Sequence, residues 1–153
     1  MTESASATFD TAVRLHVYRH FLDAGRPPGP AETARDLGED PRAVEAAYLR
    51  LAEAHHLVLE PGTTRVCMAM PLSAEPTAFR VETPRGAYWA NCAWDAFGIP
   101  AMLGSDARIL TSCACCRDPW ALEVKDGALA SGDAGVLHVL VPPSRWWDDI
   151  AFT

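Results

Sequence analysis

The sequence predicts an α+β fold in two parts. A winged-helix-like three-helix domain with a β-hairpin is expected at residues 1–72, and a small α+β domain at residues 77–153. Three observations predict it. Three amphipathic helical segments come first, two short apolar runs flank a turn next, and strand-like runs then alternate with one short helix. The stretch Pro71–Pro76 separates the two parts and is predicted to be a linker.

The first two helices are predicted from their apolar spacing and their ends. Residues 8–24 form an amphipathic pattern that Gly25 and the following prolines end. Its apolar positions are Val13, Leu15, Val17, Phe21 and Leu22. Residues 30–38 predict a short second helix that ends at its glycine.

A third helix and a hairpin complete the first domain. Asp40 is a predicted N-cap, Pro41 suits the first helical position, and the helix is expected to reach about His55. Its candidate core residues are Val44, Ala47, Leu49 and Leu51. Residues 57–59 and 66–70 are apolar and flank a Pro-Gly turn, which predicts a β-hairpin.

The second domain is expected to combine strands with one helix. Strands are predicted at residues 78–82, 108–111, 120–124 and 136–141, with a turn at 131–133 before the last. A helix is predicted at residues 92–104, and Pro100 is expected to kink or break it.

Composition limits the classes of function. The chain has 153 residues, a hydrophobic content of 49% and a formal net charge of −7. Its apolar runs are too short to span a bilayer and its N-terminus lacks a secretory signal, so a cytoplasmic protein without membrane contact is expected. The negative charge makes DNA an unlikely partner. Five clustered cysteines favour reduced, metal-binding or reactive thiols over disulfides.

Cys92 and Asp95 are the first candidate site residues. Asn91 is a candidate N-cap, so Cys92 stands at the predicted start of a helix, and a spacing of three places both side chains on one face. The helix N-terminus favours the thiolate, whereas the neighbouring carboxylate raises the thiol pKa. If the pair is partly buried, it can share one proton. The alternative is a small buried cysteine beside a capping or solvated carboxylate.

A second sulfur cluster follows at Cys113, Cys115 and Cys116. Its thiolates could bind a soft metal. The cluster lacks the paired spacing of structural zinc sites, so these cysteines could equally be packed in a loop.

The segment Cys92–Gly104 resembles the alkylmercury (organomercurial) lyase family. The resemblance rests on Cys-x-x-Asp followed by Pro100-Ala101 and Gly104, and it continues through Ala107–Ile109 and Ser112–Ala114 to Pro119. A winged-helix-like domain before a small α+β catalytic domain is also what this family implies. The second domain is therefore expected to be alkylmercury-lyase-like.

The resemblance implies protonolysis of a carbon–mercury bond to a hydrocarbon and Hg(II). Cys92 would be the thiolate ligand of mercury and Asp95 the proton donor, with no organic cofactor. Cellular thiols or a mercuric reductase would accept Hg(II). The metal-ligand set expected for mercury is Cys92, Asp95, Cys113, Cys115 and Cys116.

The chain departs from the family at one position. The family's second catalytic cysteine lies further downstream, and no cysteine follows Cys116 here, so a chain truncated at its C-terminus is expected. Two alternatives stay open. The protein could bind metal or organometal through thiols without cleavage, or it could be a metal-responsive winged-helix regulator.

Overall fold

The computed structural model describes residues 3–131 and 135–150. Ala151–Thr153 at the end of the predicted second domain, and most of the turn predicted at 131–133, lie outside the described residues. The helices, one of them a 3₁₀ helix, are α1 (Glu3–Ala24), α2 (Pro30–Leu37), α3 (Pro41–Glu53), α4 (Ala93–Leu103) and η1 (Pro143–Asp148). The strands are β1 (Val58–Leu59), β2 (Val66–Ala69), β3 (Leu72–Ser73), β4 (Arg80–Thr83), β5 (Gly86–Ala90), β6 (Ala107–Ser112), β7 (Pro119–Lys125) and β8 (Ala128–Ser131).

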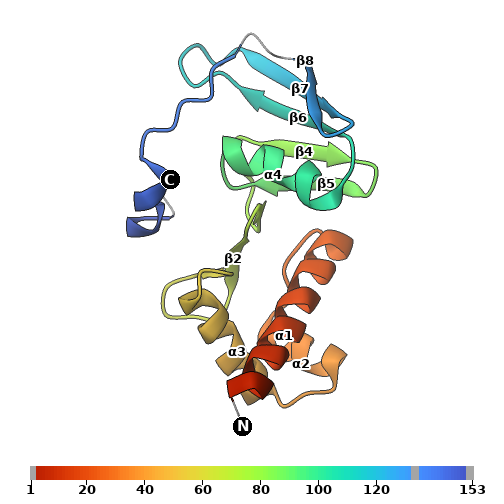
Figure 1. Ribbon diagram of the computed structural model, residues 1–153, viewed down its shortest axis with the longest axis vertical. Helices are drawn as coiled ribbons and strands as arrows, with labels where there is room; N and C mark the ends of the chain where they lie inside the picture. The colour runs from red at the N-terminus through yellow and green to blue at the C-terminus, as the bar shows by residue number, and fades with distance from the viewer. Residues whose placement is uncertain (1–2, 132–134, 151–153) are drawn as a thin grey trace.

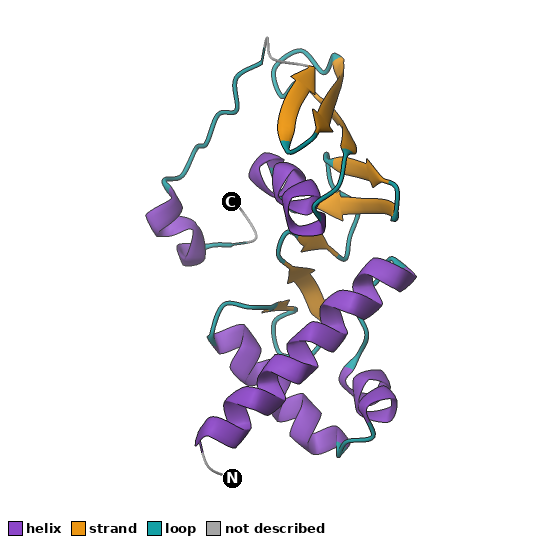
Figure 2. Cartoon of the chain, turned by 45° about the vertical axis from the view of Figure 1, so that its right-hand side comes forward, coloured by secondary structure: helices purple, strands orange, loops and turns teal. Residues whose placement is uncertain are grey.

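The molecule is elongated, with α1–α3 at one end and β6–β8 at the other (Figure 1). One antiparallel sheet runs between the ends in the order β1-β2-β3-β5-β4-β6-β7-β8. The helix α4 packs against β4 and β5 (Figure 2). None of the described helices is long and apolar enough to cross a membrane.

The helical end follows the predicted pattern closely. Asp40 caps α3 by accepting a hydrogen bond from the backbone N–H of Arg42 at 2.8 Å. Tyr48 is fully buried, donates to the carbonyl of Pro28 at 3.0 Å and lies 2.8 Å from the hydroxyl of Thr33. This polar contact joins α2 to α3. The hairpin β1–β2 is present, while the winged-helix assignment and the two domain boundaries stay predictions.

Two leucines, one from the apolar positions of the first helix and one from the candidate core of the third, are on the outside. Leu15 is 47% exposed and Leu49 is 53% exposed, whereas the other helix residues predicted for the core are buried or partly buried. Each leucine lies two positions from a buried residue, and two helical positions turn the side chain by about 200°, away from the core. The prediction for these two was wrong.

Two further expectations were wrong, and a third was wrong in part. Leu72 and Ser73, inside the predicted linker, form the buried strand β3 between β2 and β5. Residues 136–141 form no strand, and Val136 is 91% exposed, because β8 supplies the last pairing of the described sheet instead. The break considered at Pro100 does not occur, since α4 continues to Leu103, while the kink stays a prediction.

Candidate functional site

The predicted cysteine helix positions the candidate site. Cys92 itself is the N-cap of α4, with an extended backbone, and Asn91 precedes the cap, so the N-cap predicted at Asn91 was wrong by one residue. Gly104 ends the helix in the left-handed conformation with φ of 58°. Gly98 faces the neighbouring turn, where a Cβ would stand 3.2 Å from that of Pro71. The helix is therefore held closely against the β2–β3 turn.

The structure brings Cys92 and Asp95 together. The Sγ of Cys92 donates a hydrogen bond to Oδ2 of Asp95 at 3.4 Å. Asn91, which precedes the pair, is partly buried and donates through Nδ2 to the carbonyl of Leu72 at 3.5 Å. Both members of the pair are partly buried, while Trp94 between them is 64% exposed.

Burial raises the pKa of both groups. For Cys92, burial is the main cause; the backbone N–H of Asp95 lowers the thiol pKa, and the Asp95 charge raises it again. For Asp95, burial raises the carboxyl pKa against the hydrogen bonds from Cys92 and Asn91. The expected thiolate bias from the helix N-terminus is therefore outweighed. A pair in which both pKa values are raised tends to keep a proton.

Tyr18 of α1 approaches the same site, and the sequence analysis missed it. Its hydroxyl donates to the carbonyl of Met70 at 2.8 Å, and the guanidinium of Arg14 lies 5.8 Å from its ring centre. Burial raises the Tyr18 pKa, Arg14 opposes this rise, and the charge of Asp95 adds a smaller increase. Tyr18 is 77 residues from Asp95 in the chain, so no local spacing could have indicated that the Asp95 charge reaches it.

The second sulfur cluster is compact and exposed. The ligand atoms of Cys113, Cys115 and Cys116 lie within 4.8 Å of one another, and the first two sulfurs are 3.3 Å apart. Backbone N–H groups of Cys116 and Cys115 lower the pKa of Cys113 to about 7. Within this cluster, Cys113 is therefore the cysteine whose deprotonated thiolate form is favoured. Cys92 belongs to no group of three potential metal ligands whose ligand atoms lie within 4.8 Å of one another, among residues 3–131 and 135–150.

Strand register relates the two sulfur sites. Trp89 of β5 and Leu110 of β6 both pair with Arg80 of β4, on its two sides. Cys92 and Cys113 each follow three residues later, so their segments leave the sheet at the same end. Two strand spacings, roughly 10 Å, separate these segments. The five predicted mercury ligands therefore form two neighbouring sites instead of one.

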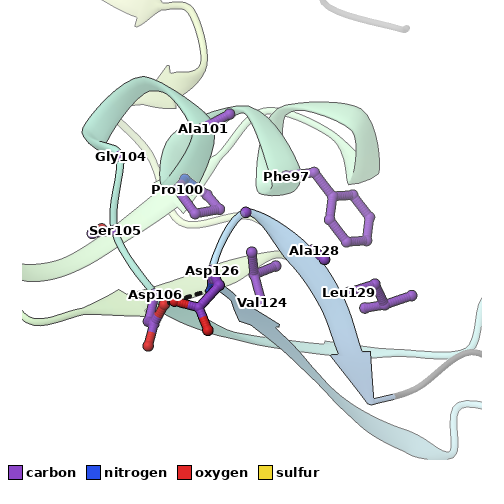
Figure 3. A pocket seen from close by; sticks show the side chains of 11 residues that line it. Phe97, Pro100, Ala101, Gly104, Ser105, Asp106, Val124, Asp126, Ala128 and Leu129 are labelled. Atoms are coloured by element: carbon purple, nitrogen blue, oxygen red, sulfur yellow. Dashed lines mark hydrogen bonds between the residues drawn. The ribbon is translucent and has the colours of Figure 1, made fainter.

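A separate hollow lies near the other end of α4 (Figure 3). Its volume is about 360 Å³, and its lining includes Phe97, Pro100 and Leu129. At its edge the backbone N–H of Asp126 donates to Asp106 at 3.0 Å. Cys92 and Asp95 are not among its lining residues, so the hollow is not the candidate thiol site.

Comparison with known proteins defines the class. The family model of the alkylmercury lyases, MerB, matches residues 72–153, and the chain belongs to this family. Among solved structures, the mercury-bound form of MerB2 is similar, with a TM-score of 0.61 and 21% sequence identity. The match covers 77% of this chain and 58% of the MerB2 chain, so this chain spans little more than half the length of that relative. No curated protein matches the chain.

Proposed function

We propose that this protein cleaves carbon–mercury bonds by protonolysis, with Cys92 as the mercury ligand and Asp95 as the proton donor. The observation that carries the proposal is the 3.4 Å contact between the Cys92 thiol and the Asp95 carboxylate at the start of α4. Membership of the alkylmercury lyase family supports the same chemistry.

The first step is capture of the substrate. Mercury is a soft metal and prefers thiolate ligands. With one proton on the pair, the Cys92 thiol holds it and donates it to the Asp95 carboxylate, which takes the proton as Cys92 binds mercury. Cys92 then displaces a small thiolate from R–Hg–SR′, which forms one sulfur–mercury bond and breaks another. The product is R–Hg–S–Cys92, with the carboxylic acid of Asp95 beside it.

The second step breaks the carbon–mercury bond. A second thiolate binds mercury as the Asp95 proton passes to carbon, which releases the hydrocarbon R–H and leaves Hg(II) between two sulfurs. The raised Asp95 pKa supports this donor role, because it increases the fraction of carboxylic acid at neutral pH. The second thiolate is a small cellular thiol, because Cys113 belongs to the separate sulfur cluster. Cellular thiols or a mercuric reductase then take Hg(II), and no organic cofactor is required.

The direct test is benzene release from phenylmercury in excess thiol. We expect Cys92→Ala to abolish release and Asp95→Ala to reduce it by about 100-fold or more, as loss of a general acid does. Cys67→Ala is the matched control, since Cys67 is a partly buried thiol of β2 outside the candidate site, and it should keep activity. Equal release by Cys92→Ala and Cys67→Ala would contradict the proposal.

A thiol-based capture protein is the second candidate. The exposed triad of Cys113, Cys115 and Cys116 favours it, because three sulfurs within 4.8 Å can hold a soft ion without any proton donor. Capture predicts stoichiometric phenylmercury retained on the protein and no benzene. Mass spectrometry of the intact complex distinguishes the two functions, and Cys113→Ser shows which sulfur holds the mercurial.

A further inference from the structure

Two histidines and an aspartate meet on the helical layer, outside the residues matched by the family. His16 and His20 lie one helical turn apart on α1, so their side chains share a face. Asp36, near the end of α2, faces them. One ligand atom from each of the three residues lies within 4.8 Å of the others, and Nε2 of His16 is 3.6 Å from Oδ2 of Asp36.

The imidazole nitrogens of this cluster are buried without hydrogen bonds. Nε2 of His16 and Nε2 of His20 are both shielded from solvent, and neither has a hydrogen-bond partner among the described residues. A buried polar atom without a partner costs about 1–3 kcal/mol. Two such atoms in a cluster whose ligand atoms lie within 4.8 Å of one another indicate that a ligand joins them.

The carboxylate of Asp36 has one oxygen available for such a ligand. Its Oδ1 accepts a hydrogen bond from Nε of Arg35 at 3.0 Å, which leaves Oδ2 toward His16. Glu32 is also near, with Oε1 3.8 Å from Nε2 of His20. Both Glu32 oxygens are already bound by Arg26, at 2.8 and 2.9 Å. Asp36 is therefore the available acidic ligand, and Glu32 lies beside the cluster.

We propose that His16, His20 and Asp36 bind a divalent transition-metal ion of the zinc type. Two imidazole nitrogens and one carboxylate oxygen form a set that zinc accepts, with water as the fourth ligand. Tetrahedral zinc with bonds of about 2.0–2.1 Å separates its ligand atoms by roughly 3.3 Å. The 3.6 Å contact between His16 and Asp36 is close to this value. The site has no thiolate, so it discriminates against soft mercury, which the cysteines bind better.

The bound metal would cross-link α1 and α2. The opposite face of α1 carries Tyr18, which faces away from the metal ligands. Tyr18 lies two positions from each histidine, and a helix turns by about 200° over two residues. Its contact with Met70 therefore lies on the other side of α1 from the metal ligands. Zinc bound by the folded state alone should raise the melting temperature.

Zinc titration of the full chain tests the proposal. Cys113, Cys115 and Cys116 are replaced by serine in every sample, so that the exposed thiols do not compete. We expect calorimetry to give one zinc per chain, and His16→Gln or His20→Gln to weaken binding by at least about 10-fold. His138→Gln is the control, since His138 is exposed and outside the cluster. It should bind zinc unchanged.

Two further measurements separate a lost ligand from a lost fold. Asp36→Asn alters a partly exposed side chain, should keep the circular dichroism spectrum, and should still weaken zinc binding. Cobalt bound in the same protein should show no thiolate charge-transfer band. Absence of zinc binding, or equal binding by His16→Gln and His138→Gln, would show that the cluster is a set of ion pairs only.

Discussion

Burial governs the acidity of Cys92 and Asp95 more than the helix N-terminus does. Both pKa values are raised, and burial is the largest cause for each. The carboxylate is thereby available as an acid, and the thiol is restrained until a soft metal replaces its proton. Residue chemistry at this site therefore depends on how α4 is packed and on the turn at Pro71 that faces it.

The raised Asp95 pKa predicts a pH-dependent effect of Asp95→Asn on stability. The pKa of Asp95 is higher in the folded state than in the unfolded state, where it is about 3.9. Protonation of Asp95 therefore stabilises the fold fully below about pH 3.9, and this stabilisation is lost as the pH rises through the folded-state pKa. Asparagine has no charge to bury, so it escapes this loss. Relative to the wild type, we expect the Tm of the variant to rise between acid and neutral pH. Calorimetry across that range checks it; a constant difference in Tm would contradict it.

The sequence predicted the residue pair but not its surroundings. The Cys92–Asp95 contact follows from local helix spacing, which is why it could be predicted. The approach of Tyr18 and the coming together of His16, His20 and Asp36 depend on how α1 packs against other elements. Such packing leaves no trace in local periodicity.

Among the elements, the helices were predicted better than the strands. α2 and α3 have strong end signals, at Gly38 and at Asp40 followed by Pro41, and both helices form close to the expected positions. β3 has only two residues, which is too short for an alternation of apolar and polar residues. β8 is exposed throughout, so it has no buried face that such an alternation could mark. Residues 136–141 have the apolar composition of a strand without forming one, because composition does not supply a pairing partner.

The end of α4 offers a prediction at this scale. Gly104 has a φ of 58°, and no atom stands within 4 Å of where a Cβ would be. Gly104→Ala should therefore lower the free energy of unfolding by about 1 kcal/mol, because of backbone strain alone and without a steric clash. Gly104→Asn should lower the free energy of unfolding by less, because asparagine tolerates the left-handed region better than alanine does. Urea unfolding of both variants measures the difference, and equal losses would show that strain is not the cause.

At the scale of the whole molecule, β3 connects the helical end to the rest of the sheet. It pairs with β2 on one side and β5 on the other, and Leu72 is fully buried in the core cluster. This continuity means that the two predicted domains share one sheet, although the sequence at Pro71–Pro76 has the composition of a linker.

Truncation of Leu72 should therefore destabilise both ends together. Leu72→Ala removes a buried side chain and should cost about 2–5 kcal/mol, with a single unfolding transition seen by all probes. Leu49→Ala is the matched control, since Leu49 is 53% exposed, and should change stability by no more than about 0.5 kcal/mol. Two separate transitions in the Leu72 variant would mean that the ends unfold independently.

The strand order also affects how the chain acquires its structure. The order departs from the chain sequence only where β5 precedes β4, and the pairings join strands that are neighbours or near neighbours in the chain. Contacts between nearby segments close with a small entropy loss and favour fast folding. During synthesis, β1–β3 can pair before β6–β8 are made, so the sheet can form progressively as the ribosome adds each strand.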